Sequence, residues 1–327
     1  MQAALFEAYL KLQEGARARG WMRRRPLRKL SRSLYKRLRC GERIATTCRG
    51  LTWCLDVRDP YFTPSLVLEG GHEPYETEYF AKLVGPGMTV VDVGAHVGWY
   101  TLLAAQRVGA SGRVVAFEPD PANYALLVQN VTANGFRNVE TVQQAVSDGC
   151  RQAAFFLDPK NPGGHRLADW SDGRPSIPVE VTSLDAFFSA SLHPIDVVKI
   201  DTEGVELSVW RGMQRVLQRS PHLRVMMEFS PEALLRCGAS PERLLAECQQ
   251  SGFTAYWLNG QTQRVLPKPL EELLAICRQG DQYTNLFLFR TLDDAPGSRE
   301  RVEAGAGSDR PHSISGAAAS AEGRSGV

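Results

Sequence analysis

The sequence predicts an α/β protein with a doubly wound, mostly parallel sheet, and three observations support this. From Met88 onward, short apolar runs typical of buried parallel strands alternate with helical stretches. Glycines and acidic residues directly follow three of these runs, at the sheet edge where open α/β sheets bind their ligands. The 327 residues, 43% of them hydrophobic and 23% charged, are enough for a full core.

The alternation defines the expected elements. Core strands are expected at 89–93, 113–117, 139–145, 195–200, 223–229, 254–258 and 285–289. Helices are expected at 75–84, 99–108, 121–134, 205–217 and 231–251, and two extra strands, 153–157 and 177–181, flank a Gly/Pro-rich loop. No helical pattern long enough for a crossover separates the last two core strands, so we expect an antiparallel hairpin at the sheet edge.

The chain divides into three expected parts. Residues 1–74 form an N-terminal arm, with helices over 1–43, a strand pair over 44–58 and a loop over 59–74. Residues 75–290 form the main domain. Residues 291–327 contain few large apolar side chains and are predicted to be disordered.

The arm is strongly basic. Residues 17–43 contain twelve Arg or Lys and one acid, so this segment carries +11 and the remainder −9 of a net charge of +2. Three interpretations are open: the leucines at 27, 30, 34 and 38 pack on the domain, the helix contacts an anionic membrane surface, or it binds nucleic acid. We favour the first, and nucleic acid is the least favoured because few aromatic residues interleave the charges.

The remaining composition points to a cytoplasmic protein. Seven cysteines without a C-x-x-C pair are typical of isolated, reduced thiols. No apolar run reaches the length of a membrane span, and the first residues do not read as a signal peptide.

The first chemical motif is an apolar strand followed by a glycine turn, Val91-Asp92-Val93-Gly94-Ala95-His96-Val97-Gly98. Gly94 and Gly98 would let a ligand approach the backbone closely, next to a helix N-terminus. Their spacing does not fit the G-x-G-x-x-G pattern of dinucleotide sites. Asp92 disfavours a pyrophosphate and favours a cationic or hydroxylated ligand.

Two further motifs place acids at strand ends. Glu118 follows the second strand, where one carboxylate can accept both hydroxyl protons of a ribose. Asp201 and Glu203 follow the strand that ends at Ile200, beside Gly204 and Glu206. We therefore expect a ligand that crosses these three strand ends.

These segments resemble the FkbM family of methyltransferases, which have the class I fold and depend on S-adenosylmethionine (SAM). The resemblance covers about residues 70–260 and rests on Val91–Tyr100, Phe117–Asp120, Gln144–Asp148, and Lys199–Glu206 followed by Trp210–Met213. It implies that Asp92 and Gly94 contact the methionine part of SAM and that Glu118 binds the ribose. Ser147 and Asp148 would lie near the adenine, and Asp201 near the methyl group. The family usually has Asn where this chain has His96.

The expected reaction is transfer of the methyl group to a hydroxyl of a sugar, a glycan or another small molecule, with Asp201 or Glu203 orienting or deprotonating it. Two alternatives are an NAD(P)-dependent oxidoreductase and a non-catalytic, SAM-binding or nucleic-acid-associated module. Asp201, Glu203 and Glu228 could together approach a divalent metal, but we predict none. The acceptor and the oligomeric state stay open.

Overall fold

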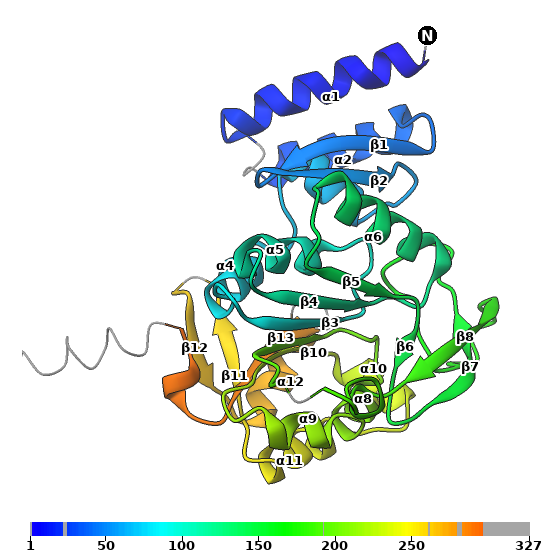
Figure 1. Cartoon of the computed structure of the whole chain (residues 1–327). Helices are drawn as coiled ribbons and strands as arrows, with labels where there is room; N and C mark the ends of the chain where they lie inside the picture. Colours follow the sequence, from blue (N-terminus) through cyan, green and yellow to red (C-terminus); the bar gives the residue numbers. More distant parts are fainter. Residues whose placement is uncertain (1, 22–24, 192, 261, 280–282, 297–327) are drawn as a thin grey trace, which may run out of the picture.

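The computed structural model describes residues 2–21, 25–191, 193–260, 262–279 and 283–296. Its central sheet has eight strands in the order β12-β11-β13-β10-β9-β3-β4-β5. Five run parallel: β3 (Thr89–Val93), β4 (Arg113–Phe117), β5 (Val139–Val142), β9 (Val197–Ile200) and β10 (Arg224–Phe229). Three are antiparallel: β11 (Thr254–Asn259), β12 (Arg264–Pro267) and β13 (Thr284–Phe289). The predicted mostly parallel sheet with an antiparallel edge is confirmed (Figure 1).

Helices cover both faces of this sheet (Figure 1). One face carries α4 (Pro74–Leu83), α5 (Trp99–Val108) and α6 (Pro121–Ala133). The other carries α8 (Glu206–Arg211), α9 (Gln214–Arg219), α11 (Pro241–Gln250) and α12 (Leu270–Gln279). Successive strand residues point to opposite faces, so Val90 joins the core under α5 while Val91 joins the core around Trp210.

A small second sheet stands beside the end of the parallel strands. It consists of β6 (Ala145–Val146), β8 (Ser176–Thr182) and β7 (Arg151–Phe156), and β7 and β8 pair antiparallel. The strand expected at 139–145 is therefore two strands in different sheets. The chain between β7 and β8 reaches over the edge of the parallel sheet, where it meets the ligand cavity described below.

Several helices are shorter than expected because glycines interrupt them. The expected helix 205–217 breaks at Gly212, where an added Cβ would lie 2.1 Å from the Ser147 carbonyl oxygen. The expected helix 231–251 divides into α10 (Pro231–Arg236) and α11, with Gly238 in the left-handed region between them. Helix α12 was not expected: its ten residues lie in the long connection of the predicted antiparallel edge hairpin.

The arm contains α1 (Gln2–Ala18), α2 (Arg25–Leu38) and the hairpin of β1 (Arg43–Cys48) with β2 (Leu51–Asp56). Residues expected as loop form the short helix α3 (Phe62–Pro64) and a π-helical turn at Ser65–Glu69. Phe6, Tyr9 and Tyr35 are buried in the same core as the helices of the sheet's first face. Among the described residues, no helix has the length and apolarity to cross a membrane.

The favoured packing of the arm leucines is wrong. Leu27, Leu30 and Leu34 are 39%, 58% and 36% exposed, and only Leu38 is partly buried against the core. Helix α2 instead buries Ser31 and Tyr35, whose hydroxyl groups have partners inside: Tyr9 Oη lies 2.8 Å from Ser31 Oγ, and Tyr35 donates to the Val57 carbonyl. Polar residues that satisfy hydrogen bonds have taken the buried side of the helix.

The main body extends slightly beyond its expected end at residue 290. A 3-10 turn at Leu292–Asp294 follows β13, and the Asp294 carbonyl accepts from Arg224. The remainder of the expected disordered tail, 297–327, lies outside the described residues.

Candidate active site

A cavity of about 800 Å³ lies at the C-terminal ends of β3, β4, β9 and β10. The loop between β7 and β8 and residues of the arm complete its wall. Four of the predicted site residues line it: Gly94, Glu118, Asp201 and Glu203. Both the volume and the position are typical of a small-molecule site in an open α/β sheet.

Gly94 forms the close contact between two strand ends. Its φ of +78° is in the left-handed region, and an added Cβ would lie 1.9 Å from the carbonyl oxygen of Asp201. Only glycine fits there, because a side chain would push the β9 end away from the turn. Gly94 thus brings Asp201 to the cavity wall.

Asp92 and Gly98 support this turn from behind and do not line the cavity. Asp92 is buried, its Oδ2 accepts from the Thr101 hydroxyl at 2.6 Å, and no described residue hydrogen-bonds its Oδ1. An added Cβ at Gly98 would meet the Leu127 and Leu102 side chains at 2.8 and 2.9 Å. Any effect of these two residues on a ligand would therefore act through the shape of the turn.

Glu118 lies buried at the end of β4 and holds two backbone N–H groups. Its Oε2 accepts from His96 N at 2.8 Å and its Oε1 from Asp120 N at 2.9 Å. Burial raises the pKa of Glu118 to about 8, against the effect of these two hydrogen bonds. Each oxygen keeps a free lone pair for a hydroxyl, as a ribose-binding acid requires.

Ser147 and Asp148 lie outside the cavity wall, which instead includes Gln144, Ala145 and Val146. Ser147 N donates to a backbone carbonyl of the small sheet, and Asp148 pairs with Arg151 at 2.8 Å. If an adenine ring binds beside this segment, the three residues that precede Ser147 are the ones placed to touch it.

The end of β9 carries a network around one lysine. Lys199 Nζ lies 2.9 Å from Asp201 Oδ2, 3.3 Å from the Gly94 carbonyl oxygen and 3.9 Å from Asp92 Oδ1. These two carboxylates raise the pKa of the buried Lys199, in opposition to burial, so it stays charged. The lysine thereby fixes the Asp201 carboxylate toward the glycine turn.

Glu203 stands next to Asp201 on a loop that Glu206 organises. Glu206 Oε1 accepts from the backbone N–H groups of Thr202 and Gly204 and from the Thr202 hydroxyl. Glu203 has a φ of +56°, an unusual conformation for this residue type. Burial first, and then the charges of Asp201 and Glu206, raise the pKa of Glu203 to about 8.

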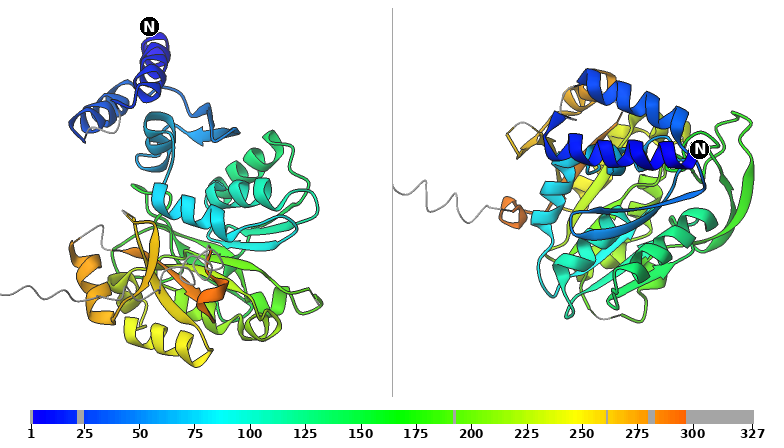
Figure 2. Two further views of the ribbon diagram at one scale, coloured as in Figure 1. Left: turned by 90° about the vertical axis from the view of Figure 1, so that its left-hand side faces the viewer. Right: turned by 90° about the horizontal axis from the view of Figure 1, so that it is seen from above.

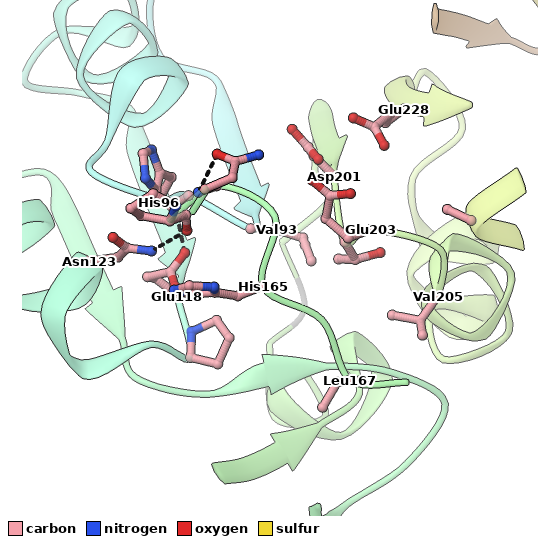
Figure 3. Close-up of a pocket in the computed structure, with 18 of the residues that line it drawn as sticks. Val93, His96, Glu118, Asn123, His165, Leu167, Asp201, Glu203, Val205 and Glu228 are labelled. Carbon is pink, nitrogen blue, oxygen red and sulfur yellow. Dashed lines mark hydrogen bonds between the residues drawn. The ribbon is translucent and has the colours of Figure 1, made fainter. Parts of the chain in front are cut away.

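Glu228 completes the acidic side of the cavity from the neighbouring strand β10. Carboxylate oxygens of Asp201, Glu203 and Glu228 lie within 4.8 Å of one another (Figure 3). Burial and the nearby acids raise the pKa of Glu228 well above its ordinary value.

The opposite wall carries His96, noted above as a departure from the resembling family, together with two polar residues that the sequence did not indicate, Asn123 and His165 (Figure 3). His96 is half-buried, its buried Nε2 has no hydrogen-bond partner among the described residues, and burial lowers its pKa to about 3. His96 is therefore neutral and adopts a left-handed φ of +51°, a conformation in which Asn and His are both enriched. That shared preference explains why His can stand where the resembling family has Asn.

His72 and Glu73, at the end of the arm, also line the cavity. Glu73 accepts a hydrogen bond from the Tyr100 hydroxyl at 2.7 Å, and His72 Nε2 lies 3.9 Å from the same carboxylate. Asp59 also lines the cavity but caps a turn, accepting from Tyr61 N and Phe62 N. Its carboxylate is thus occupied by the backbone of its own turn.

The doubly wound sheet, the glycine turn at the end of β3 and the acids at the ends of β4 and β9 define the class: a SAM-dependent methyltransferase fold. The model of the methyltransferase FkbM domain matches residues 92–254, so the chain carries a domain of the FkbM methyltransferase family.

Two curated relatives are methyltransferases. Methyltransferase 1 of Beauveria bassiana is 24% identical over 144 residues, covering 38% of this chain and 57% of that protein. Ribosomal RNA large subunit methyltransferase E of Nitrobacter winogradskyi is 28% identical over 155 residues, covering 44% and 63%. The chain thus spans about 60% of the length of these relatives. A SAM-dependent methyltransferase structure from Aquifex aeolicus aligns with a TM-score of 0.38 at 14% identity, covering 66% of this chain and 89% of that one.

The cavity fits SAM, the cofactor of this class. The buried Glu118 carboxylate has lone pairs left for ribose hydroxyls, and Gly94 keeps the turn free of side-chain atoms. The unpartnered His96 Nε2 offers one more polar atom in the cofactor half. Glu118 and the glycine turn would hold the cofactor, with the acids of β9 and β10 beyond it.

Proposed function

We propose that the protein transfers the methyl group of SAM to a hydroxyl of a sugar, a glycan or another polyhydroxylated small molecule. The observation that carries the proposal is the position of Asp201 and Glu203, which line one cavity with Glu118 and Gly94. Bound SAM supplies an electrophilic methyl group. The chain must hold the acceptor oxygen in line with it and take the hydroxyl proton.

Glu203 is the best candidate for the proton acceptor. A general base works best when its pKa lies near the operating pH, and burial beside Asp201 raises the pKa of Glu203 to about 8. Asp201 is fixed by Lys199 and suits the role of orienting the hydroxyl. Attack of the oxygen on the methyl carbon leaves the C–S electron pair on sulfur, and the proton goes to the carboxylate.

The charge of the cavity supports a neutral acceptor. The described lining contains eight acids, Asp59, Glu73, Glu118, Asp172, Asp201, Glu203, Glu228 and Glu232, and three bases, Lys199, Arg174 and Arg236. Each base is already paired: Lys199 with Asp201, Arg174 with Asp158, and Arg236 with Glu232. No Lys or Arg of the described lining is therefore left to pair with a phosphate backbone, whereas carboxyl groups, ionised or protonated, readily form hydrogen bonds with sugar hydroxyls. This speaks against a nucleic-acid acceptor.

Methyl-labelled SAM, incubated with the enzyme and fractionated cell extract, tests the proposal through mass spectrometry and NMR of the labelled product. We expect an O-methyl ether, lost in Asp201→Asn and kept in Glu140→Gln, a surface acid paired with Arg113 far from the cavity. Calorimetric titration tests the oxidoreductase alternative, because tight NAD binding without SAM binding would refute the proposal. In the labelling experiment, label found on RNA would also refute it.

A further inference from the structure

The three acids at the ends of β9 and β10 form a cluster without matching positive charge. Three carboxylates within 4.8 Å repel one another, and the cost grows when they are partly buried. The one described cation in contact with them is Lys199, which is shared between Asp201 and Asp92. It donates to Oδ2 of Asp201, and no described residue hydrogen-bonds Oδ1.

Glu228 provides a second, independent observation. Glu228 is 8% exposed, and no hydrogen bond or ion pair to its carboxylate occurs among the described residues. Figure 3 shows the carboxylate beside Asp201 and Glu203, on the cavity side of β10. A buried carboxylate without a donor is costly, and its position indicates that a ligand of opposite charge belongs there.

We propose that Asp201, Glu203 and Glu228 bind one divalent cation of the oxygen-preferring kind, Mg²⁺ or Mn²⁺. Carboxylates from two adjacent strand ends leave further coordination positions open toward the cavity, as these ions need for water or substrate oxygens. Under the proposed function, on which this role alone rests, the cation would hold the acceptor hydroxyl, and the Glu203 oxygen that is not a ligand would take its proton. Cation binding itself can be measured without any acceptor.

The test is an electron paramagnetic resonance titration of free Mn²⁺ with the full chain, in the absence of SAM and acceptor. We expect one bound Mn²⁺ per chain, at least tenfold weaker binding in Glu228→Gln through the loss of one charged ligand, and unchanged binding in Glu242→Gln, an exposed acid on α11. SAM affinity of the Glu228 variant, measured separately, shows that it is folded.

Two outcomes would overturn the cation site: no bound Mn²⁺ at millimolar concentration, or equal binding by wild type and Glu228→Gln. Failure of the proposed function looks different. Mn²⁺ would then bind as expected while no hydroxyl compound becomes methylated.

A second inference rests on the exposed leucines of the arm. The geometry of an α-helix shows which way they face relative to the body. Side chains advance by 100° per residue along a helix. In α1, Arg17 donates to the Leu66 carbonyl of the body, and Tyr9 contacts Ser31 of α2. Leu5 and Leu12 lie on the far side of Tyr9 from Arg17, so they face away from the body.

The contacts of α2 fix its orientation in the same way. Arg32 pairs with Glu69 of the body at 2.6 Å, and Ser31 faces α1. Leu27, Leu30 and Leu34 lie on the far side of Ser31 from Arg32. We call the five exposed leucines 5, 12, 27, 30 and 34 the leucine face; Figure 2 shows the two helices side by side at that end of the molecule.

We infer that the leucine face lies on the surface of an anionic bilayer. Helix α2 contains six basic residues and no acid, and the acids of α1, Glu7 and Glu14, lie on the side opposite its leucines. Exposed Trp21 follows α1. An apolar face with cations around it matches the interface of anionic lipids, whereas a phosphate backbone alone would leave the leucines in water.

Vesicle sedimentation at physiological salt tests this inference. We expect the full chain to sediment with phosphatidylserine-containing vesicles and not with pure phosphatidylcholine. The combined change Leu27→Ser, Leu30→Ser and Leu34→Ser should abolish sedimentation and leave the melting temperature nearly unchanged, because these side chains are exposed. Absence of binding, equal binding by the variant, or dimerisation through these leucines in its place would overturn the inference.

Discussion

Glu118 is the residue whose removal should affect cofactor binding most directly. Glu118→Ala removes charge-assisted hydrogen bonds to the ribose hydroxyls, and we expect SAM binding to weaken by about 1–3 kcal/mol. It also leaves His96 N and Asp120 N without their acceptor. Calorimetric titration measures the loss, and an unchanged dissociation constant would mean that Glu118 does not bind the ribose.

Gly94 should be intolerant of even one added carbon atom. Gly94→Ala combines left-handed strain of about 1–2 kcal/mol with the clash against the Asp201 carbonyl. We expect a lower melting temperature together with at least roughly tenfold weaker SAM binding, a loss of about 1.4 kcal/mol. Gly135→Ala is the matched control: its φ of +68° is similar, but nothing lies within 4 Å of an added Cβ. Equal effects in the two variants would contradict a role for the close contact.

The sequence predicted residues of the cavity best where a glycine or an acidic residue directly follows a strand. Gly94, Glu118 and Asp201 come directly after apolar runs, so their meeting at one sheet edge follows from the parallel topology. Glu228 was considered only as a metal ligand, and His165 was missed, because its loop between β7 and β8 has no periodicity to place it. Its contact with the cavity depends on the fold of the small sheet.

At the level of elements, the spacing of the leucines predicted helix α2 correctly, but the side of the helix expected to face the body was wrong. Leucines 27, 30 and 34 mark one side of the helix, but periodicity does not say which side meets the body. The buried side was chosen by tyrosine and serine, which combine apolar contact with satisfied hydrogen bonds. Helix breaks were likewise hidden, since a single glycine such as Gly212 is compatible with a helix until its neighbours are known.

Tyr35 should therefore carry the stability of the arm. It is fully buried, its ring packs edge-on against Phe6 and its hydroxyl donates to the Val57 carbonyl. We expect Tyr35→Ala to lower the free energy of unfolding by about 3–5 kcal/mol, as for other buried aromatic residues. Leu30→Ala, on the exposed side of the same helix, should change it by about 0.5 kcal/mol or less. Urea denaturation that reverses this order would contradict the observed orientation of α2.

Over the whole molecule, arm and sheet share a core. Phe6, Tyr9 and Tyr35 join the cluster that contains Trp53 and Leu102, so a boundary at residue 74 separates segments of sequence more than independent folding units. We keep the division at 74 and 75 as a proposal about function, in which the arm faces a membrane and the sheet binds the cofactor. The basic arm and the acidic cavity both contribute to the uneven charge of the sequence.

The acids of the cavity should make the ligand-free protein more stable at mildly acidic pH than at alkaline pH. Burial raises the pKa of Glu118 to about 8, although the Asp120 and His96 N–H groups and the Lys199 charge oppose the shift, and the pKa of Glu203 is raised similarly. Between its ordinary value of 4.5 and about 8, each acid holds its proton only when folded. Unfolding releases these protons, so stability falls as pH rises through this window, by up to about 1.4 kcal/mol per pH unit for each proton.

Thermal unfolding in the presence of a chelator, from about pH 5.5 to pH 8.5, measures this dependence. We expect the melting temperature to decrease across the range and the slope to become shallower in Glu118→Gln, which cannot ionise. SAM should reverse the trend, because its ribose hydroxyls favour the ionised carboxylate and its affinity should increase as Glu118 loses its proton. A melting temperature that rises steadily with pH would show that these carboxylates are ionised in the folded protein, and would contradict the raised pKa that favours Glu203 as the proton acceptor.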